Sequence, residues 1–124
     1  MKIYVAAPYS MREDAQKTMK QLEDLGYEVT STWLKIVDNE DCETAEMDLA
    51  DIERAHALVL LNPPEYANKG NGGRHVEFGY ALACGKRLIV IGVKTNVFHQ
   101  LDNVSFYESF SEVPWNDYAR ACVA

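Results

Sequence analysis

A single carboxylate, that of Glu77, interrupts an apolar helix pattern in the second half of the chain. It follows the glycine-rich segment GNGG at residues 70–73 and lies about one turn into the helix expected to begin there. A helix start offers free N–H groups and a partial positive charge, both of which favour an ionised carboxylate. Such a carboxylate in a cleft can be a nucleophile, and an exposed acid that complements the dipole is the simpler interpretation. Spacing alone leaves both open.

Two residues of the same helix share the face of Glu77, because each lies three positions away. Arg74 could orient or neutralise the carboxylate, and Tyr80 could donate a hydrogen bond to it. The preceding glycines allow a ligand to approach the backbone closely. However, the loop lacks the Gly-Lys-Ser/Thr end of a P-loop and does not form the G-x-G-x-x-G fingerprint.

A second pair of acids, Asp48 and Asp51, lies in the segment EMDLADIERAHAL. The two are three positions apart and therefore share one face of a predicted helix. An acid at the edge of the core can donate a proton, whereas a solvated helix face is the alternative. We favour the solvated face for Asp51, and composition does not decide for Asp48. For Cys84, in a helix of small residues, a buried inert thiol is expected.

The elements that must position these residues alternate along the chain. Alternating strands and helices indicate βαβ units in a single domain of residues 1–124, a doubly wound, flavodoxin-like or Rossmann-like α/β fold. Its parallel sheet should have about five strands, with helices on both faces. Strands are expected at 2–7, 27–32, 57–62, 87–93 and 104–106, and helices from a Ser10–Glu13 capping box to Gly26, at 44–55, at 73–84 and from Pro114.

In such folds ligands bind beyond the carboxyl ends of the strands. This rule selects the loop after the first strand, the loop after the third strand and the end of the fourth. The candidate binding residues in the first two loops are Ala7, Tyr9, Ser10, Arg12, Asn62, Asn71, Gly72 and Gly73, with Arg74 and Tyr80 on the helix that follows.

Composition restricts the possible partners. The net charge of −7 argues against nucleic acid or an anionic membrane as the main partner. Apolar runs are far shorter than the roughly 20 residues of a membrane helix, and the N-terminal run is too short for a signal peptide. Three scattered cysteines favour the reducing cytoplasm, and no Cys or His spacing suggests a metal site.

Three segments, KIYVAAPYS, MDLADIERAHALVLL and GGRHVEFGYALACGK, resemble the nucleoside 2-deoxyribosyltransferases and the related nucleotide N-glycosidases. The resemblance covers roughly the first three-quarters of the chain. It implies that Glu77 attacks C1′ of the sugar, that Asp48 helps protonate the departing base and that Tyr9 is the aromatic residue near the site. It implies no metal and no organic cofactor. It also implies a homo-oligomer in which a neighbouring subunit completes the site, with Asn96 and His99 as candidates for that role.

Asn71 differs from both groups of enzymes that the chain resembles. At this position the resemblance implies an Asp in the transferases and a Ser in the nucleotide hydrolases. Its amide can donate to a phosphate or pair with a base edge. We therefore expect cleavage of the N-glycosidic bond of a nucleoside or its 5′-monophosphate through a covalent glycosyl-Glu intermediate, with transfer to a free nucleobase as the first choice. Hydrolysis of a nucleoside 5′-monophosphate is the alternative. A catalytically silent nucleotide-binding or sensor domain is the alternative of another class.

Overall fold

The computed structural model describes residues 1–34 and 44–118. Its strands and helices follow the predicted alternation. The longer elements are β1 (Lys2–Ala6), α1 (Arg12–Asp24), β2 (Glu28–Val29), α2 (Ala45–Arg54), β3 (Ala57–Asn62), α3 (Gly73–Ala83), β4 (Arg87–Gly92) and β5 (Val104–Tyr107). Short 3-10 turns lie at Tyr9–Met11 (η1), Thr32–Leu34 (η2), Pro64–Tyr66 (η3), Val97–Gln100 (η4) and Phe110–Glu112 (η5).

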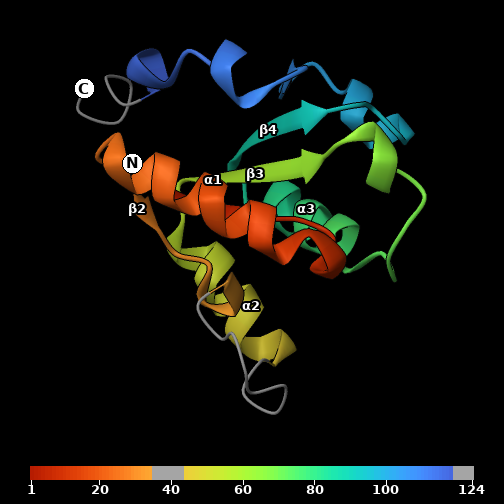
Figure 1. The fold of residues 1–124 in the computed structure, drawn as a ribbon. Coiled ribbons are helices and arrows are strands. Elements are labelled where there is room, and N and C mark those ends of the chain that lie inside the picture. Colours follow the sequence, from red (N-terminus) through yellow and green to blue (C-terminus); the bar gives the residue numbers. More distant parts are fainter. Residues whose placement is uncertain (35–43, 119–124) are drawn as a thin grey trace.

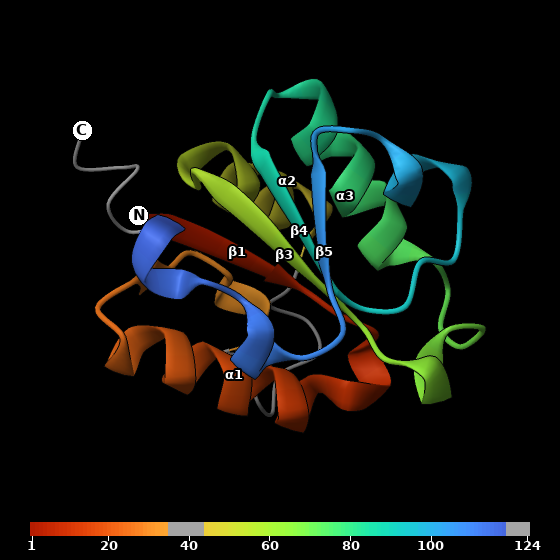
Figure 2. The same ribbon diagram turned by 90° about the horizontal axis from the view of Figure 1, so that it is seen from above.

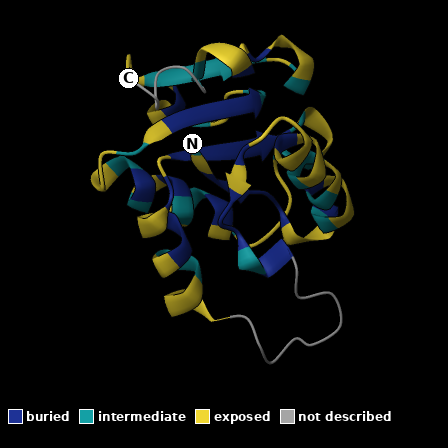
Figure 3. Ribbon diagram, turned by 90° about the vertical axis from the view of Figure 1, so that its left-hand side faces the viewer, coloured by how far each residue is buried: buried dark blue, intermediate teal, exposed yellow. Residues whose placement is uncertain are grey.

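The sheet contains five parallel strands in the order β2-β1-β3-β4-β5, which confirms the predicted doubly wound class. The residues of β3 are all buried, as expected for an apolar strand covered on both faces. Figure 3 shows the buried strands between helices whose outer faces are exposed. The six-residue register of β3 with β4, from Ala57 opposite Arg87 to Asn62 opposite Gly92, brings the carboxyl ends of both strands to one edge.

Helices cover both faces of this sheet (Figures 1 and 2). The first helix, α1, lies on one face with the segment that follows β5, and α2 and α3 lie together on the other. This division follows from right-handed crossovers, because the chain moves from β1 outward to β2 and then back past β1 to β3. The reversal between β1 and β3 is the topological switch point, where ligands of such folds bind.

Local details differ from the sequence-based prediction in three places. The first helix begins at Arg12 instead of Ser10, because the chain forms the turn η1 after Pro8, and the Met11 N–H donates to the Pro8 carbonyl at 3.0 Å. The second strand is shorter than predicted. The last helix begins one residue after Pro114, at 115–118. Elsewhere Thr44 caps α2 as the boundary predicted, accepting from the Met47 N–H at 3.2 Å.

Among the described residues, no helix is long and apolar enough to cross a membrane.

Gly92 ends β4 at a point where no side chain fits. Its φ is +126°, and a Cβ there would lie 2.1 Å from the Asn62 carbonyl oxygen. We expect Gly92→Ala to lower the free energy of unfolding by about 3 kcal/mol or more. The alanine cannot keep both the positive φ of Gly92 and its close approach to the Asn62 carbonyl. Urea denaturation measures this change.

The matched control is Gly79→Ala, in the interior of α3, where an added Cβ meets no atom within 4 Å. This variant should keep or raise stability, by up to about 1 kcal/mol. Equal losses of stability in the two variants would contradict the role of Gly92.

Candidate active site

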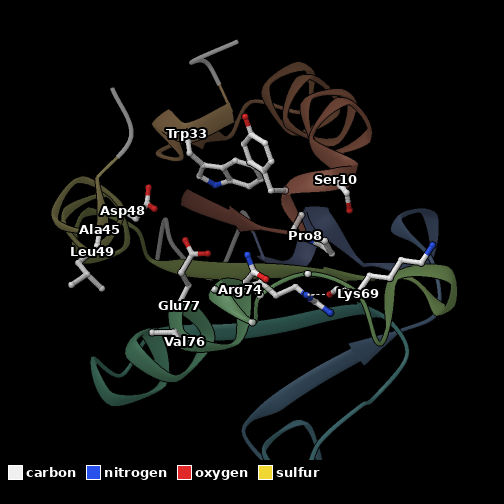
Figure 4. Close-up of a pocket in the computed structure, with 16 residues that line it drawn as sticks. Pro8, Ser10, Trp33, Ala45, Asp48, Leu49, Lys69, Arg74, Val76 and Glu77 are labelled. Carbon is white, nitrogen blue, oxygen red and sulfur yellow. Dashed lines mark hydrogen bonds between the residues drawn. The ribbon is translucent and has the colours of Figure 1, made fainter. Parts of the chain in front are cut away.

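A pocket of about 720 Å³ lies at the switch point between β1 and β3. Its walls come from the segment after β1, the turn η2, the first two turns of α2, and the glycine loop with the start of α3 (Figure 4). Two predicted loops and both predicted acidic helices therefore meet in one place. The lining residues are Ala7, Pro8, Tyr9, Ser10, Trp33, Ala45, Asp48, Leu49, Lys69, Gly70, Asn71, Gly72, Gly73, Arg74, Val76 and Glu77.

Glu77 is held by a residue that the sequence interpretation did not select. Tyr4 lies in the middle of β1 with no exposed surface, and its hydroxyl donates a hydrogen bond to Oε2 of Glu77. Burial and the neighbouring Glu77 carboxylate raise the pKa of Tyr4 far above its ordinary value, so the phenol stays protonated and remains a donor. The available signal was the phenol itself, because a buried tyrosine hydroxyl in an otherwise apolar strand must find a partner.

Asp48 shares this environment. Figure 4 shows its carboxylate, on α2, and that of Glu77, on α3, directed into the same pocket. The negative charge of Asp48 also contributes to the raised pKa of Tyr4, after burial and the effects of Glu77. The charges of two carboxylates from two helices therefore affect one hydroxyl, that of Tyr4 in the middle of β1.

Asp51 is buried and paired, so the solvated helix face expected for it is wrong. Its side chain is 3% exposed, and Oδ2 accepts from the N–H and the hydroxyl of Thr32 at 3.0 and 2.6 Å. Oδ1 pairs with Arg54 at 2.7 Å. These bonds fix the turn η2 and hence Trp33, whose indole N–H donates to the Val5 carbonyl at 3.0 Å while the ring lines the pocket.

The two predicted partners of Glu77 on its own helix bond elsewhere. The guanidinium of Arg74 donates to the loop before α3. The hydroxyl of Tyr80 donates to the carboxylate of Glu53 on α2, and this hydrogen bond, with burial, raises the pKa of Tyr80 to about 12. Tyr80 does not line the pocket, and its role in substrate binding stays a prediction.

Several other predicted binding residues also lie outside the pocket lining. The amide of Asn62 is fully buried and donates to the Val93 carbonyl at 2.8 Å. Asn96 caps η4 by accepting from the Phe98 N–H at 2.9 Å. Arg12 lies over the Tyr9 ring, 4.7 Å from its centroid.

His99 is 1% exposed, and its role in completing the site of a neighbouring copy stays a prediction. Its ring packs edge-on against Phe78, with centroids 5.1 Å apart, and lies 5.8 Å from the ring of His75. Its Nδ1 accepts from the Thr95 N–H at 3.1 Å. The thiol of Cys84 is exposed at the end of α3, so the buried thiol expected there is wrong.

The described residues contain no group of three or more His, Cys, Asp or Glu side chains placed to hold a metal ion. The pocket offers the carboxylates of Asp48 and Glu77, the hydroxyls of Tyr9 and Ser10, the Lys69 ammonium group, the neutral Asn71 amide and the N–H donors at the start of α3.

No protein-family model matches the sequence, and no curated protein matches it. Among solved structures, the chain is similar to a 2-deoxyribosyltransferase from the psychrotolerant bacterium Bacillus psychrosaccharolyticus, with a TM-score of 0.67 and 21% identity over 95% of this chain and 90% of that one. It is also similar to the Clostridium botulinum CMP N-glycosidase, with a TM-score of 0.62 and 20% identity over 98% of this chain and 99% of that one. The protein therefore belongs to the α/β class, and its pocket, which contains two carboxylates, lies at the switch point of the parallel sheet. More narrowly, its fold is that of the nucleoside deoxyribosyltransferases, as the sequence resemblance implied.

The neighbouring rings of His75 and His99 predict how stability depends on pH. Burial lowers the pKa of both His75 and His99, and nearby Arg74 lowers both further. Because the unfolded chain binds protons at an ordinary pKa of about 6.5, while the folded chain resists them, the free energy of unfolding should decrease as the pH falls below about 6.5. Each ring can contribute a slope of at most about 1.4 kcal/mol per pH unit.

Urea denaturation between neutral and mildly acidic pH measures this slope. His99→Gln keeps an acceptor for the Thr95 N–H and removes one titrating ring, so the slope should become shallower. His56→Gln, at the exposed amino end of β3, is the matched control. Identical slopes for the His99 variant and the unaltered protein would contradict the prediction.

Proposed function

We propose that this chain cleaves the N-glycosidic bond of a nucleoside or nucleoside 5′-monophosphate and transfers the sugar to another nucleobase. The observation that carries the proposal is the Tyr4–Glu77 hydrogen bond inside a pocket that also contains Asp48. A carboxylate that is oriented by a fixed donor and lines a pocket is suited to attack a sugar carbon. The two structural neighbours, a 2-deoxyribosyltransferase and a CMP N-glycosidase, act on this type of bond.

In the first step an oxygen of Glu77 attacks C1′ while the bond from C1′ to the base nitrogen breaks. The electron pair of that bond goes to the base, which takes a proton from Asp48, so the reactive form of the site has Asp48 protonated and Glu77 ionised. Positive charge develops at C1′ in the oxocarbenium-like transition state, and the Glu77 carboxylate stabilises it. Tyr4 keeps its proton throughout and fixes which oxygen of Glu77 faces the sugar.

In the second step a nitrogen of an incoming base attacks C1′ of the glycosyl-Glu77 ester, and Glu77 leaves as a carboxylate. The incoming base loses its proton to the group that protonated the first base, which restores the site. Water in place of the second base gives hydrolysis, with the same bonds to Glu77 formed and broken. Transfer and hydrolysis therefore differ in the second acceptor and not in the role of Glu77.

Hydrolysis of a nucleoside 5′-monophosphate is the second candidate function. It is favoured by the residues at the end of the pocket that lies away from Asp48 and Glu77. Lys69 and Ser10 line that end with the start of α3, so a cation, a hydroxyl and helix N–H groups are available to an anionic group. Asn71 adds a neutral amide that can donate to a phosphate oxygen.

We also propose that a second copy of the chain completes the pocket. Val76 lies on the pocket wall with 69% of its surface exposed, so it offers apolar surface to a second copy. A neighbouring subunit would cover it and shield the ester from water.

The chemistry is tested by Glu77→Gln, which keeps the size and an acceptor for Tyr4 but removes the nucleophile. We expect the rate of base release to fall by at least about 10³-fold, since the covalent route is lost. The assay incubates deoxynucleosides with and without a second free base, and deoxynucleoside 5′-monophosphates alone, and separates the products by chromatography. Exchanged nucleoside indicates transfer, and free base from a monophosphate indicates hydrolysis.

The control for this experiment is Glu65→Gln, an exposed acid in η3, which should leave the rate unchanged. Full activity in the Glu77 variant would contradict the proposed mechanism. If the unaltered protein binds a nucleotide without cleaving any of these substrates, the sensor alternative replaces the enzymatic one.

Tyr4→Phe isolates the hydrogen bond to the nucleophile. A bond to a charged group contributes about 1.5–3 kcal/mol, so the loss of orientation should lower kcat by about 10- to 100-fold. Tyr107→Phe is the matched control, because its hydroxyl lies 3.1 Å from that of Tyr118, a residue outside the pocket lining. Unchanged kcat in the Tyr4 variant would show that Glu77 needs no positioning by β1.

A further inference from the structure

Arg74 occupies a position that is unfavourable for a cation. It is the second residue of α3, where the helix dipole repels positive charge, and it is 4% exposed. Burial lowers the pKa of its guanidinium, which is the physical sign of that desolvation. A buried charge is tolerated when hydrogen bonds replace its lost water. The hydrogen-bond acceptors of Arg74 therefore indicate its structural role.

The partners are neutral oxygen atoms of the loop that forms the pocket end. Nη1 donates to the Lys69 carbonyl at 2.9 Å, and Nη2 donates to the carbonyls of Tyr66 and Ala67 at 3.1 and 3.3 Å. Nε donates to Oδ1 of Asn62 at 3.4 Å. Three nitrogen atoms of one rigid fork thus bind four acceptors, an arrangement that the single ammonium group of lysine cannot reproduce.

Asn62 connects this network to the sheet. Its amide nitrogen donates to the Val93 carbonyl at 2.8 Å and to the Thr95 hydroxyl at 3.1 Å, both in the segment after β4. Asn62 itself ends β3. Arg74 is therefore anchored to the carboxyl ends of two central strands, and the loop is anchored to Arg74.

Gly70 shows how closely the loop encloses the guanidinium. Its φ is +89°, and a Cβ at this position would lie 3.2 Å from Nη1 of Arg74. Both the backbone conformation and the space thus favour glycine. On its other side the same segment, residues 69–73, lines the pocket.

We propose that Arg74 is a positioning residue that preforms the substrate pocket by holding residues 66–70 against the start of α3. It lies one turn before Glu77 on the same helix, so one guanidinium sets the loop that receives the substrate relative to the carboxylate that attacks it. The link to substrate binding rests on the proposed function. The ordering of the loop by Arg74 does not, because every contact belongs to the protein alone.

Hydrogen–deuterium exchange of the ligand-free protein tests the ordering directly. In Arg74→Lys, amides of residues 66–72 should exchange at least about 10-fold faster, since their carbonyl anchors are lost, while amides of β1, β3 and β4 keep their protection. Gly70→Ala disturbs the same contact from the loop side and should give the same local pattern. Arg87→Lys, at the exposed amino end of β4, is the matched control.

Steady-state kinetics of the same variants test the consequence. Misplacement of the loop should raise KM by about 10-fold or more with a smaller effect on kcat, and methylguanidinium should restore much of the loss in Arg74→Ala but not in Glu77→Gln. A purely structural role would lower the melting temperature without this rescue.

Unchanged exchange in the loop, or faster exchange spread over the whole sheet in both loop variants, would overturn the proposal. If Arg74→Lys does not fold, Gly70→Ala decides alone. If no nucleoside or nucleotide is cleaved by the unaltered protein, the proposed function fails while the exchange result still decides whether Arg74 orders the loop.

Discussion

The parallel pairing of β1 with β3 is the constraint on which the rest of this structure depends. Four consecutive pairs, from Ile3 opposite Ala57 to Ala6 opposite Leu60, join two strands whose neighbours lie on opposite sides. Because the chain leaves β1 toward one face of the sheet and leaves β3 toward the other, the two following segments separate at the carboxyl edge. The pocket lies between these two segments.

Buried polar groups then determine the shape of that space. Tyr4, Asp51, Asn62 and Arg74 each have almost no exposed surface, and each bonds to a segment that forms a pocket wall. A buried polar group costs free energy when its partner is lost, so each wall has one favoured position. This is an economical way to build a rigid site from a glycine loop and a short 3-10 turn, neither of which is rigid by itself.

The sequence was sufficient for the doubly wound class of the sheet, because that class follows from hydrophobic periodicity and from the alternation of strands and helices. Residue spacing left Asp48 undecided, and only the family resemblance placed it in one site with Glu77. The sequence was insufficient to predict which side chains form hydrogen bonds between different helices and strands. The i±3 spacing correctly placed Tyr80 on the side of Glu77, yet the hydroxyl bonds to Glu53 because α2 packs there. Tyr4 and Asp51 were missed for the same reason, since their partners lie 73 and 19 residues away.

The charged side chains are also distributed unevenly between the two ends of the pocket. The two carboxylates lie beside α2 and β1, whereas Lys69 and the buried Arg74 lie on the loop side. In the proposed reaction positive charge develops at C1′, so the sugar carbon belongs beside the acids and any anionic group of the substrate belongs beside the loop. A substrate bound the other way round would place its developing cation near Arg74 and its anion near Glu77, and both contacts would be repulsive. In the proposed reaction, electrostatics therefore favours one orientation of a 5′-monophosphate substrate before any base-specific contact is made.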